Sequence, residues 1–167
     1  MRLGLPALLS LVALPLGAQS LGTQSVGVQQ MSGFDQPVRA RQYVAYVAES
    51  QVIPASKPVD LELRFHVVDG FHVNSHTPSS ELRIPTGLQL QPPAGVKVGA
   101  ALFPSGKPYK VGDETLDVYN EDFSVRLPVI AAAGDHAIDG ELKYQACDKA
   151  ACYPAKTLRV QIVFTAR

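Results

Sequence analysis

Apolar and polar residues alternate along several short segments of this chain. The clearest is 59–67, where every second residue is apolar, which predicts a strand with one buried face: Val59, Leu61, Leu63, Phe65 and Val67. His66 lies on the opposite, polar face and is expected to contact solvent. Asp69-Gly70 follows this segment and predicts a two-residue hairpin turn, because glycine readily adopts a positive φ.

The rest of the chain carries similar signals in shorter form. A Pro- and Gly-rich segment, 104–113, is expected to be a long loop. No stretch longer than a turn or two has the 3.6-residue period of an amphipathic helix. Further strands are predicted over 41–48, 88–90, 96–103, 116–119, 123–129, 138–146 and 157–164. About eight short strands separated by turns indicate an all-β domain over 37–167, an immunoglobulin-like antiparallel β-sandwich.

The first 36 residues have a different character. Arg2 precedes an apolar run over 3–16, and the small residues Gly17-Ala18 end it, which is the pattern of a secretory signal peptide over 1–18. An N-terminal membrane anchor is the alternative, although the run is shorter than the ~20 residues that span a bilayer. Residues 19–36 are rich in Gly, Ser and Gln and are expected to form a flexible leader. The mature chain should have no transmembrane segment and should reach an oxidising compartment.

Charge and histidine content narrow the possible ligands. The chain has 15 basic and 15 acidic residues and no cluster of either sign, which argues against a nucleic-acid partner. His72 and His76 have a possible metal-ligand spacing, and a cysteine could join them. On a strand that leads into a loop the two imidazoles need not converge, however, and no third histidine or carboxylate is evident. We therefore expect no metal site and no cofactor.

The two cysteines are the most reactive groups in the sequence. Cys147 and Cys152 are separated by four residues and lie between two predicted strands, so they could face each other across a hairpin at a Cα separation of ~4.5–5.5 Å, within disulfide range. Their parity differs, however, because Cys147 shares a face with polar residues whereas Cys152 shares one with apolar residues. A bulge or break at Pro154, which cannot donate a ladder hydrogen bond, would restore the register.

Spacing alone leaves two functions open for this pair. A structural staple is the usual role of two cysteines in a secreted domain, but a loop this short removes only about 2 kcal/mol of unfolded-state entropy, against ~4.7 for a 100-residue loop. A redox-active pair in a short loop at a domain edge would let an incoming thiolate reach one sulfur while the other stays close. Asp148 opposes thiolate formation, and Lys149 and Lys156 favour it.

Several stretches resemble the N-terminal periplasmic domain of the thiol:disulfide interchange protein DsbD, and the likeness covers roughly residues 35–165. The inter-cysteine loop is one residue shorter than in the best-known members of that family. The stretches that carry the likeness are Tyr144-Gln145-Ala146-Cys147 with Cys152-Tyr153-Pro154, the run Asp69-Gly70-Phe71-His72-Val73, and Val118-Tyr119 with Arg126-Leu127-Pro128-Val129.

The resemblance implies an oxidoreductase module with an immunoglobulin-like fold in the periplasm. It would take electrons from a membrane-embedded thiol reductase or a separate thioredoxin-like donor and pass them to periplasmic thiol:disulfide proteins, as in cytochrome c maturation. Since the sequence contains no electron carrier of its own, the reductant is expected to be a separate protein. The alternative is a non-catalytic secreted β-sandwich binding or assembly domain with a short structural disulfide.

The resemblance also assigns roles to residues. Cys152 would form the mixed disulfide with the substrate, and Cys147 would resolve it. An aromatic residue of the segment 103–113, either Phe103 or Tyr109, would cap the pair. His72 is expected beside the cysteines, where its cationic form would stabilise a thiolate. The residues expected to line the site are His72 and Asn74, which replace tyrosines of the family, together with Tyr144 and Tyr153.

Overall fold

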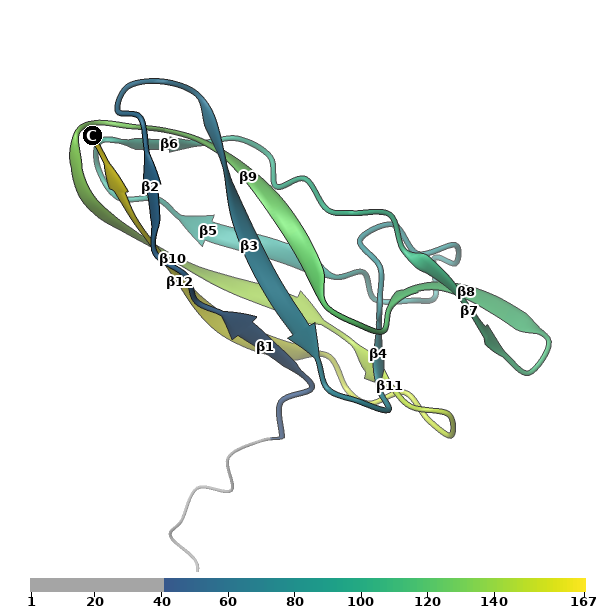
Figure 1. Ribbon diagram of the computed structural model, residues 1–167. Helices are drawn as coiled ribbons and strands as arrows, with labels where there is room; N and C mark the ends of the chain where they lie inside the picture. Colours follow the sequence, from purple (N-terminus) through teal and green to yellow (C-terminus); the bar gives the residue numbers. More distant parts are fainter. Residues whose placement is uncertain (1–40) are drawn as a thin grey trace, which may run out of the picture. The chain divides into compact units, whose positions relative to one another are not determined.

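The computed structural model describes residues 41–167, and all regular elements of this region are β-strands (Figure 1). The predicted signal peptide (1–18) and leader (19–36) lie outside the described residues. No helix able to cross a membrane is found between residues 41 and 167. The strands are β1 (Val44–Val47), β2 (Gln51–Ile53), β3 (Val59–Val67), β4 (His72–Asn74), β5 (Gly87–Gln91), β6 (Val96–Val98), β7 (Lys107–Val111), β8 (Glu114–Tyr119), β9 (Phe123–Ala131), β10 (Gly134–Tyr144), β11 (Ala146–Cys147) and β12 (Lys156–Ala166).

Two four-stranded sheets form the two layers of a sandwich. One has the order β1-β3-β9-β6 and the other the order β2-β12-β10-β5. Figure 1 shows β3 and β9 crossing in front of β10 and β12. Neighbouring strands are antiparallel except β2, which pairs in parallel with β12. The predicted immunoglobulin-like antiparallel sandwich is therefore confirmed.

The long strands bury alternate residues, as their sequence pattern predicts. On β3 the side chains of Leu61, Leu63 and Phe65 are fully buried, and the residues between them are exposed. β9, β10 and β12 turn a similar alternating face inward, so the core lies between the two large sheets. His66 points outward as expected, and its Nδ1 lies 2.6 Å from Oδ1 of Asp122.

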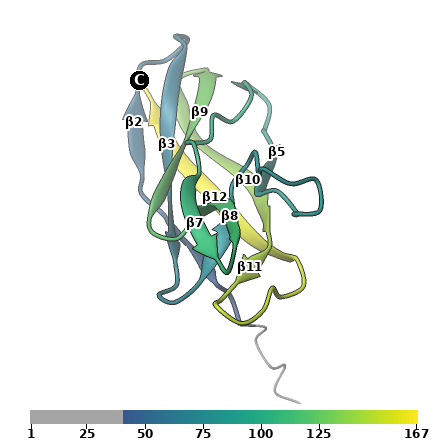
Figure 2. The same ribbon diagram turned by 90° about the vertical axis from the view of Figure 1, so that its right-hand side faces the viewer.

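A third, smaller sheet with the order β11-β4-β8-β7 lies at one end of the sandwich (Figure 2). The tight turn at Asp69-Gly70 forms, with Gly70 at φ 83° and the Phe71 N–H donating to the Val68 carbonyl at 3.1 Å. The predicted hairpin is nevertheless wrong, because β3 pairs with β1 and β9 and β4 pairs with β8 and β11. Both edges of β3 are occupied, so the turn carries the chain out of one sheet and into another.

The predicted loop 104–113 contains a strand, which corrects the sequence analysis. β7 occupies 107–111 and forms a hairpin with β8, with Gly112 at φ 60° in the turn. Pro108 is compatible with this strand because β7 is the outer strand of its sheet, where one backbone donor can face away from the ladder. The short strand β2 was also not predicted, since three residues are too few for a recognisable alternation.

Candidate functional site

The two cysteines form a disulfide at the end of the sandwich that carries the third sheet. Their sulfur atoms are 2.06 Å apart, and the two residues face each other in an isolated antiparallel bridge with a Cα–Cα distance of 4.0 Å. Cys147 lies on β11 and is only 1% exposed. Cys152 is a solvent-exposed residue. The bonded pair therefore has one accessible member and one sheltered member.

The segment 153–155 reconciles the differing parity of the two cysteines. β10 and β12 pair in continuous register as far as Tyr144 opposite Lys156, after which Cys147 faces Cys152. Two residues separate these positions on one strand and three on the other, so the second strand gains one residue between them. That residue lies in 153–155, so the predicted break in register occurs in the segment that contains Pro154.

Asp148 holds the short loop between the cysteines. Its Oδ1 accepts hydrogen bonds from the N–H groups of Ala150 at 2.7 Å and Ala151 at 2.8 Å, and its Oδ2 accepts one from the Tyr153 hydroxyl at 2.6 Å. The Tyr153 hydrogen bond and the two backbone bonds hold the pKa of Asp148 below its ordinary value. The carboxylate expected to oppose a thiolate is thus also the internal clamp of the loop.

Arg83 places a cationic group beside the accessible cysteine. Its Nη1 lies 3.6 Å from Sγ of Cys152, and its Nη2 forms an ion pair with Oε2 of Glu114 at 2.7 Å. Arg83 and Cys152 both border a cavity of about 180 Å³ at one end of the third sheet. The rest of its lining comes from the cysteine loop, His72, Val111 and Leu116. Sequence reasoning missed Arg83, because it lies 69 residues from Cys152 in a loop without any motif.

Buried hydrogen bonds anchor the loop that carries Arg83. Asn74 on β4 donates from Nδ2 to the Ile84 carbonyl at 2.9 Å and to Oε1 of Gln145 at 3.2 Å. The Asn74 carbonyl accepts a bond from the Thr86 hydroxyl at 2.6 Å. Asn74 is 1% exposed, so it does not present a polar group to a partner. It joins the Arg83 loop to the strand that leads into the cysteines.

We expect the substitution Asn74→Ala to destabilise the protein by about 2 kcal/mol, because it leaves the Ile84 carbonyl and the Gln145 amide without their shared donor. Urea unfolding followed by circular dichroism measures this change. Ser79→Ala, an exposed substitution in the same loop, is the control and should change stability by less than about 0.5 kcal/mol. Equal unfolding midpoints for the two variants would contradict the anchoring role of Asn74.

His72 lies next to the pair but not in the form expected. It faces Cys147 across the β4–β11 ladder and is 1% exposed. Burial, followed by the nearby positive charge of Arg83, lowers the pKa of His72. Both effects disfavour the charged form of the imidazole in the oxidised protein, which is the opposite of the cationic form expected beside a thiolate. Neither ring nitrogen has a hydrogen-bond partner among residues 41–167.

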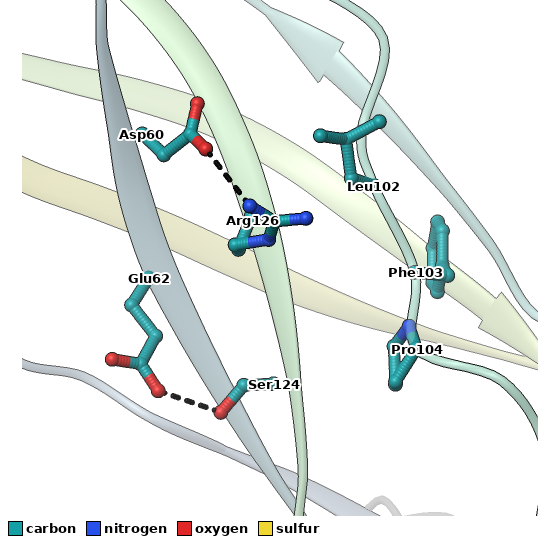
Figure 3. Close-up of a pocket in the computed structure, with 7 residues that line it drawn as sticks. All are labelled: Asp60, Glu62, Leu102, Phe103, Pro104, Ser124 and Arg126. Carbon is teal, nitrogen blue, oxygen red and sulfur yellow. Dashed lines mark hydrogen bonds and ion pairs between the residues drawn. The ribbon is translucent and has the colours of Figure 1, made fainter.

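The two candidate cap residues occupy different places. The Tyr109 ring on β7 packs against His72, with ring centroids 4.5 Å apart. Phe103 stacks on His76 instead, at 4.3 Å. Neither ring lines the cysteine cavity itself. Figure 3 shows Phe103 at a second pocket on the outer face of β3 and β9, whose other lining residues are Asp60, Glu62, Leu102, Pro104, Ser124 and Arg126.

The two tyrosines expected near the site have distinct surroundings. Tyr144 is fully buried at the end of β10, and its hydroxyl donates to Oε1 of Gln42 at 2.7 Å and accepts from the Tyr43 N–H at 3.1 Å. Tyr153 follows Cys152 directly and stacks on Tyr43 at 5.2 Å. Its ring thereby ties the cysteine loop to the sandwich, whereas Tyr144 ties β10 to the residues before β1. Neither ring lines the cavity of the cysteines.

Metal ligation has no support within the described part of the chain. No group of three His, Cys, Asp or Glu side chains there is placed to hold an ion. Of the two histidines weighed as ligands, His72 is buried beside the disulfide and His76 is exposed. The Nδ1 atom of His76 lies 2.8 Å from the Thr86 carbonyl, so this ring takes part in closing the loop 75–86.

Three solved structures are similar to this chain in fold. The N-terminal periplasmic domain of ScsB from Proteus mirabilis has a TM-score of 0.51 and 14% identity, covering 71% of this chain and 44% of that one. The reduced N-terminal domain of DsbD from Neisseria meningitidis has a TM-score of 0.43 and 19% identity, with coverage of 68% and 86%. The complex of the DsbD and PilB N-terminal domains from the same organism has a TM-score of 0.43 and 21% identity, covering 65% of this chain and 80% of that one.

Sequence comparison assigns the family. The comparison with curated proteins found no match. A family model described as the N-terminal region of the thiol:disulfide interchange protein DsbD matches residues 37–163, which is most of the chain and includes both cysteines. The exposed-and-buried cysteine pair, the sandwich fold and this match agree, and the chain belongs to the DsbD N-terminal domain family.

Proposed function

We propose that this protein is a periplasmic thiol:disulfide exchange module that carries electrons through Cys147 and Cys152. The observation that carries the proposal is the unequal exposure of two bonded cysteines in a short loop at one end of the sandwich. A partner thiolate can reach Cys152 while Cys147 stays within bonding distance beneath it. This is the arrangement that exchange through a mixed disulfide requires.

In the electron-donating direction, the reduced module begins with two thiols. After losing its proton, Cys152 attacks one sulfur of the substrate disulfide as a thiolate, and the electron pair of that bond leaves with the second substrate sulfur, which takes up a proton. Cys147, after losing its proton, then attacks the Cys152 sulfur and expels the first substrate sulfur as a thiolate, which also takes up a proton. The substrate gains two electrons and two protons, and the module returns to the disulfide form.

The β7–β8 hairpin is the proposed cap of the site, and Tyr109 is its aromatic residue. Tyr109 packs on His72, which lies opposite Cys147, and Val111 and Leu116 line the cysteine cavity. A cap of this kind would exclude small thiols until a docking protein displaces it. The proposed partners are periplasmic thiol:disulfide proteins on one side and a membrane-embedded reductase or thioredoxin-like donor on the other. The complex of the Neisseria DsbD domain with a PilB domain supports a protein partner.

The reduction potential of the pair tests this function. The purified protein is equilibrated in thiol/disulfide buffers of known potential, and its thiols are counted by alkylation and mass spectrometry. An exchangeable disulfide should have a reduction potential above about −300 mV. Structural disulfides of secreted proteins usually have reduction potentials below that value. A potential below that limit would contradict the proposal and favour a non-catalytic binding or assembly domain with a structural disulfide.

A further inference from the structure

We propose that Arg83 is a catalytic residue that stabilises the Cys152 thiolate, and that Glu114 on the β7–β8 hairpin restrains it until the hairpin is displaced. The inference deepens the proposed exchange function and rests on it. On this proposal, the docking of a partner protein controls how strongly the charge of Arg83 acts on the Cys152 sulfur.

The position of Arg83 supports the first part. Its guanidinium Nη1 lies 3.6 Å from the sulfur of Cys152, the cysteine that a partner can reach. The side chain is 24% exposed, so its charge is only partly screened by water. A cation this close favours the charged form of a thiol, which is the form that attacks the substrate disulfide. The anchored loop at 75–86 holds Arg83 in this place.

The ion pair with Glu114 supports the second part. Glu114 begins β8, next to the hairpin turn, and its Oε2 lies 2.7 Å from Nη2 of Arg83. One guanidinium therefore bridges the exposed sulfur and the tip of the proposed cap. While the hairpin is closed, the carboxylate offsets the charge of Arg83. When a partner moves the hairpin, Glu114 leaves with it, and the full charge of Arg83 acts on the sulfur.

The other charged groups around Cys152 do not supply this control. Asp148 is bound to backbone N–H groups and to the Tyr153 hydroxyl within the cysteine loop itself. Lys149 is an exposed residue of that loop and moves with it. His72 is buried with a lowered pKa and is neutral near pH 7. Arg83 contacts both the Cys152 sulfur and Glu114 of the hairpin. Among the hydrogen bonds and ion pairs of residues 41–167, no other side chain links that sulfur to the hairpin.

The test measures the Cys152 thiol in a Cys147→Ala background, where it is the single cysteine. The rate of alkylation by iodoacetamide between pH 5 and 10 gives its pKa. Arg83→Gln should raise that pKa by about 1. At pH 7 the tenfold smaller thiolate fraction is offset by a roughly threefold more nucleophilic thiolate, so alkylation should be about threefold slower. Arg83→Lys, which keeps the charge, should restore most of the rate.

Glu114→Gln should act in the opposite direction, with a lower thiol pKa and faster alkylation, and this effect should disappear when Arg83→Gln is also present. Lys107→Gln is the matched control. Lys107 is a cation of the same hairpin, but it forms its ion pair with Glu121, at 2.6 Å. Removing its charge should leave the pKa of the Cys152 thiol unchanged. The inference would be overturned if Arg83→Gln left the pKa of the Cys152 thiol unchanged. It would also be overturned if Arg83→Lys slowed alkylation as much as Arg83→Gln does.

The readout needs no physiological partner, so the two proposals fail separately. A disulfide that resists reduction while Arg83→Gln still raises the thiol pKa would refute the exchange function and leave the effect of Arg83 on the sulfur in place. A reducible pair with a pKa insensitive to Arg83 would refute only the inference. Thermal unfolding of each variant verifies that the fold is intact during the measurement.

Discussion

A Cys147→Ala variant is expected to accumulate mixed disulfides through Cys152, whereas Cys152→Ala should accumulate few. Cys152 is exposed, and in the first variant the thiol that would resolve its mixed disulfide is missing, so the adduct persists. Cys147 is 1% exposed and reacts only after local opening. Since each ~1.4 kcal/mol of opening free energy slows the reaction tenfold, the two variants should differ by at least about tenfold.

The adducts are measured by incubating each single-cysteine variant with glutathione disulfide, and separately with periplasmic extract, followed by non-reducing electrophoresis and mass spectrometry. The glutathione arm measures accessibility, and the extract arm measures recognition of protein partners. A double Cys147→Ala, Cys152→Ala variant is the control for non-covalent capture. Equal labelling of both single-cysteine variants, or stronger labelling of Cys147, would contradict the assignment of Cys152 as the attacking residue.

The second large effect is expected in the core. Phe65→Ala should destabilise the protein by about 3–5 kcal/mol, because the side chain is fully buried on β3 and its removal leaves a cavity. The ring stacks on Phe123 at 5.2 Å and meets Tyr46 at 5.4 Å, so the contacts between β3, β9 and β1 all lose a partner. Urea denaturation with the disulfide intact measures the free energy of unfolding.

Arg64→Ala is the matched control for this prediction. Arg64 is the preceding residue on β3, its side chain is 54% exposed, and its ion pairs with Glu49 and Glu62 are 3.5 Å long. Exposed pairs of this kind contribute at most about 1 kcal/mol. A loss in Arg64→Ala as large as the loss in Phe65→Ala would show that burial on alternate positions does not account for the stability of this strand.

The sequence was sufficient to predict those elements whose burial is visible in the local pattern of apolar and polar residues. β3 and β9 alternate apolar and polar side chains because one face of each is buried, and this pattern is local. The cysteine loop was found for a similar reason, since two reactive side chains lie in one short segment. The parity mismatch even located the extra residue in 153–155, because the period of a strand is two and an offset of one residue is detectable.

Features that depend on the environment rather than on local sequence were missed. Asp69-Gly70 has the composition of a hairpin turn, but which strands pair depends on the free edges of β3, and those are set by segments far away in the sequence. Arg83 gives no signal at all, because only the tertiary structure brings it to Cys152. The lowered pKa of His72 could not be predicted either, because it results from burial, which the local sequence does not reveal.

The hydrogen bonds of Asp148 determine what happens to the loop when its sulfur–sulfur bond is cut. They join Asp148 to Ala150, Ala151 and Tyr153, and none of them uses a sulfur atom. The backbone between the cysteines therefore has hydrogen bonds that hold its curved path independently of the disulfide. We therefore expect the loop to keep its shape in the reduced protein, so that the two sulfur atoms remain near each other when the covalent link is absent.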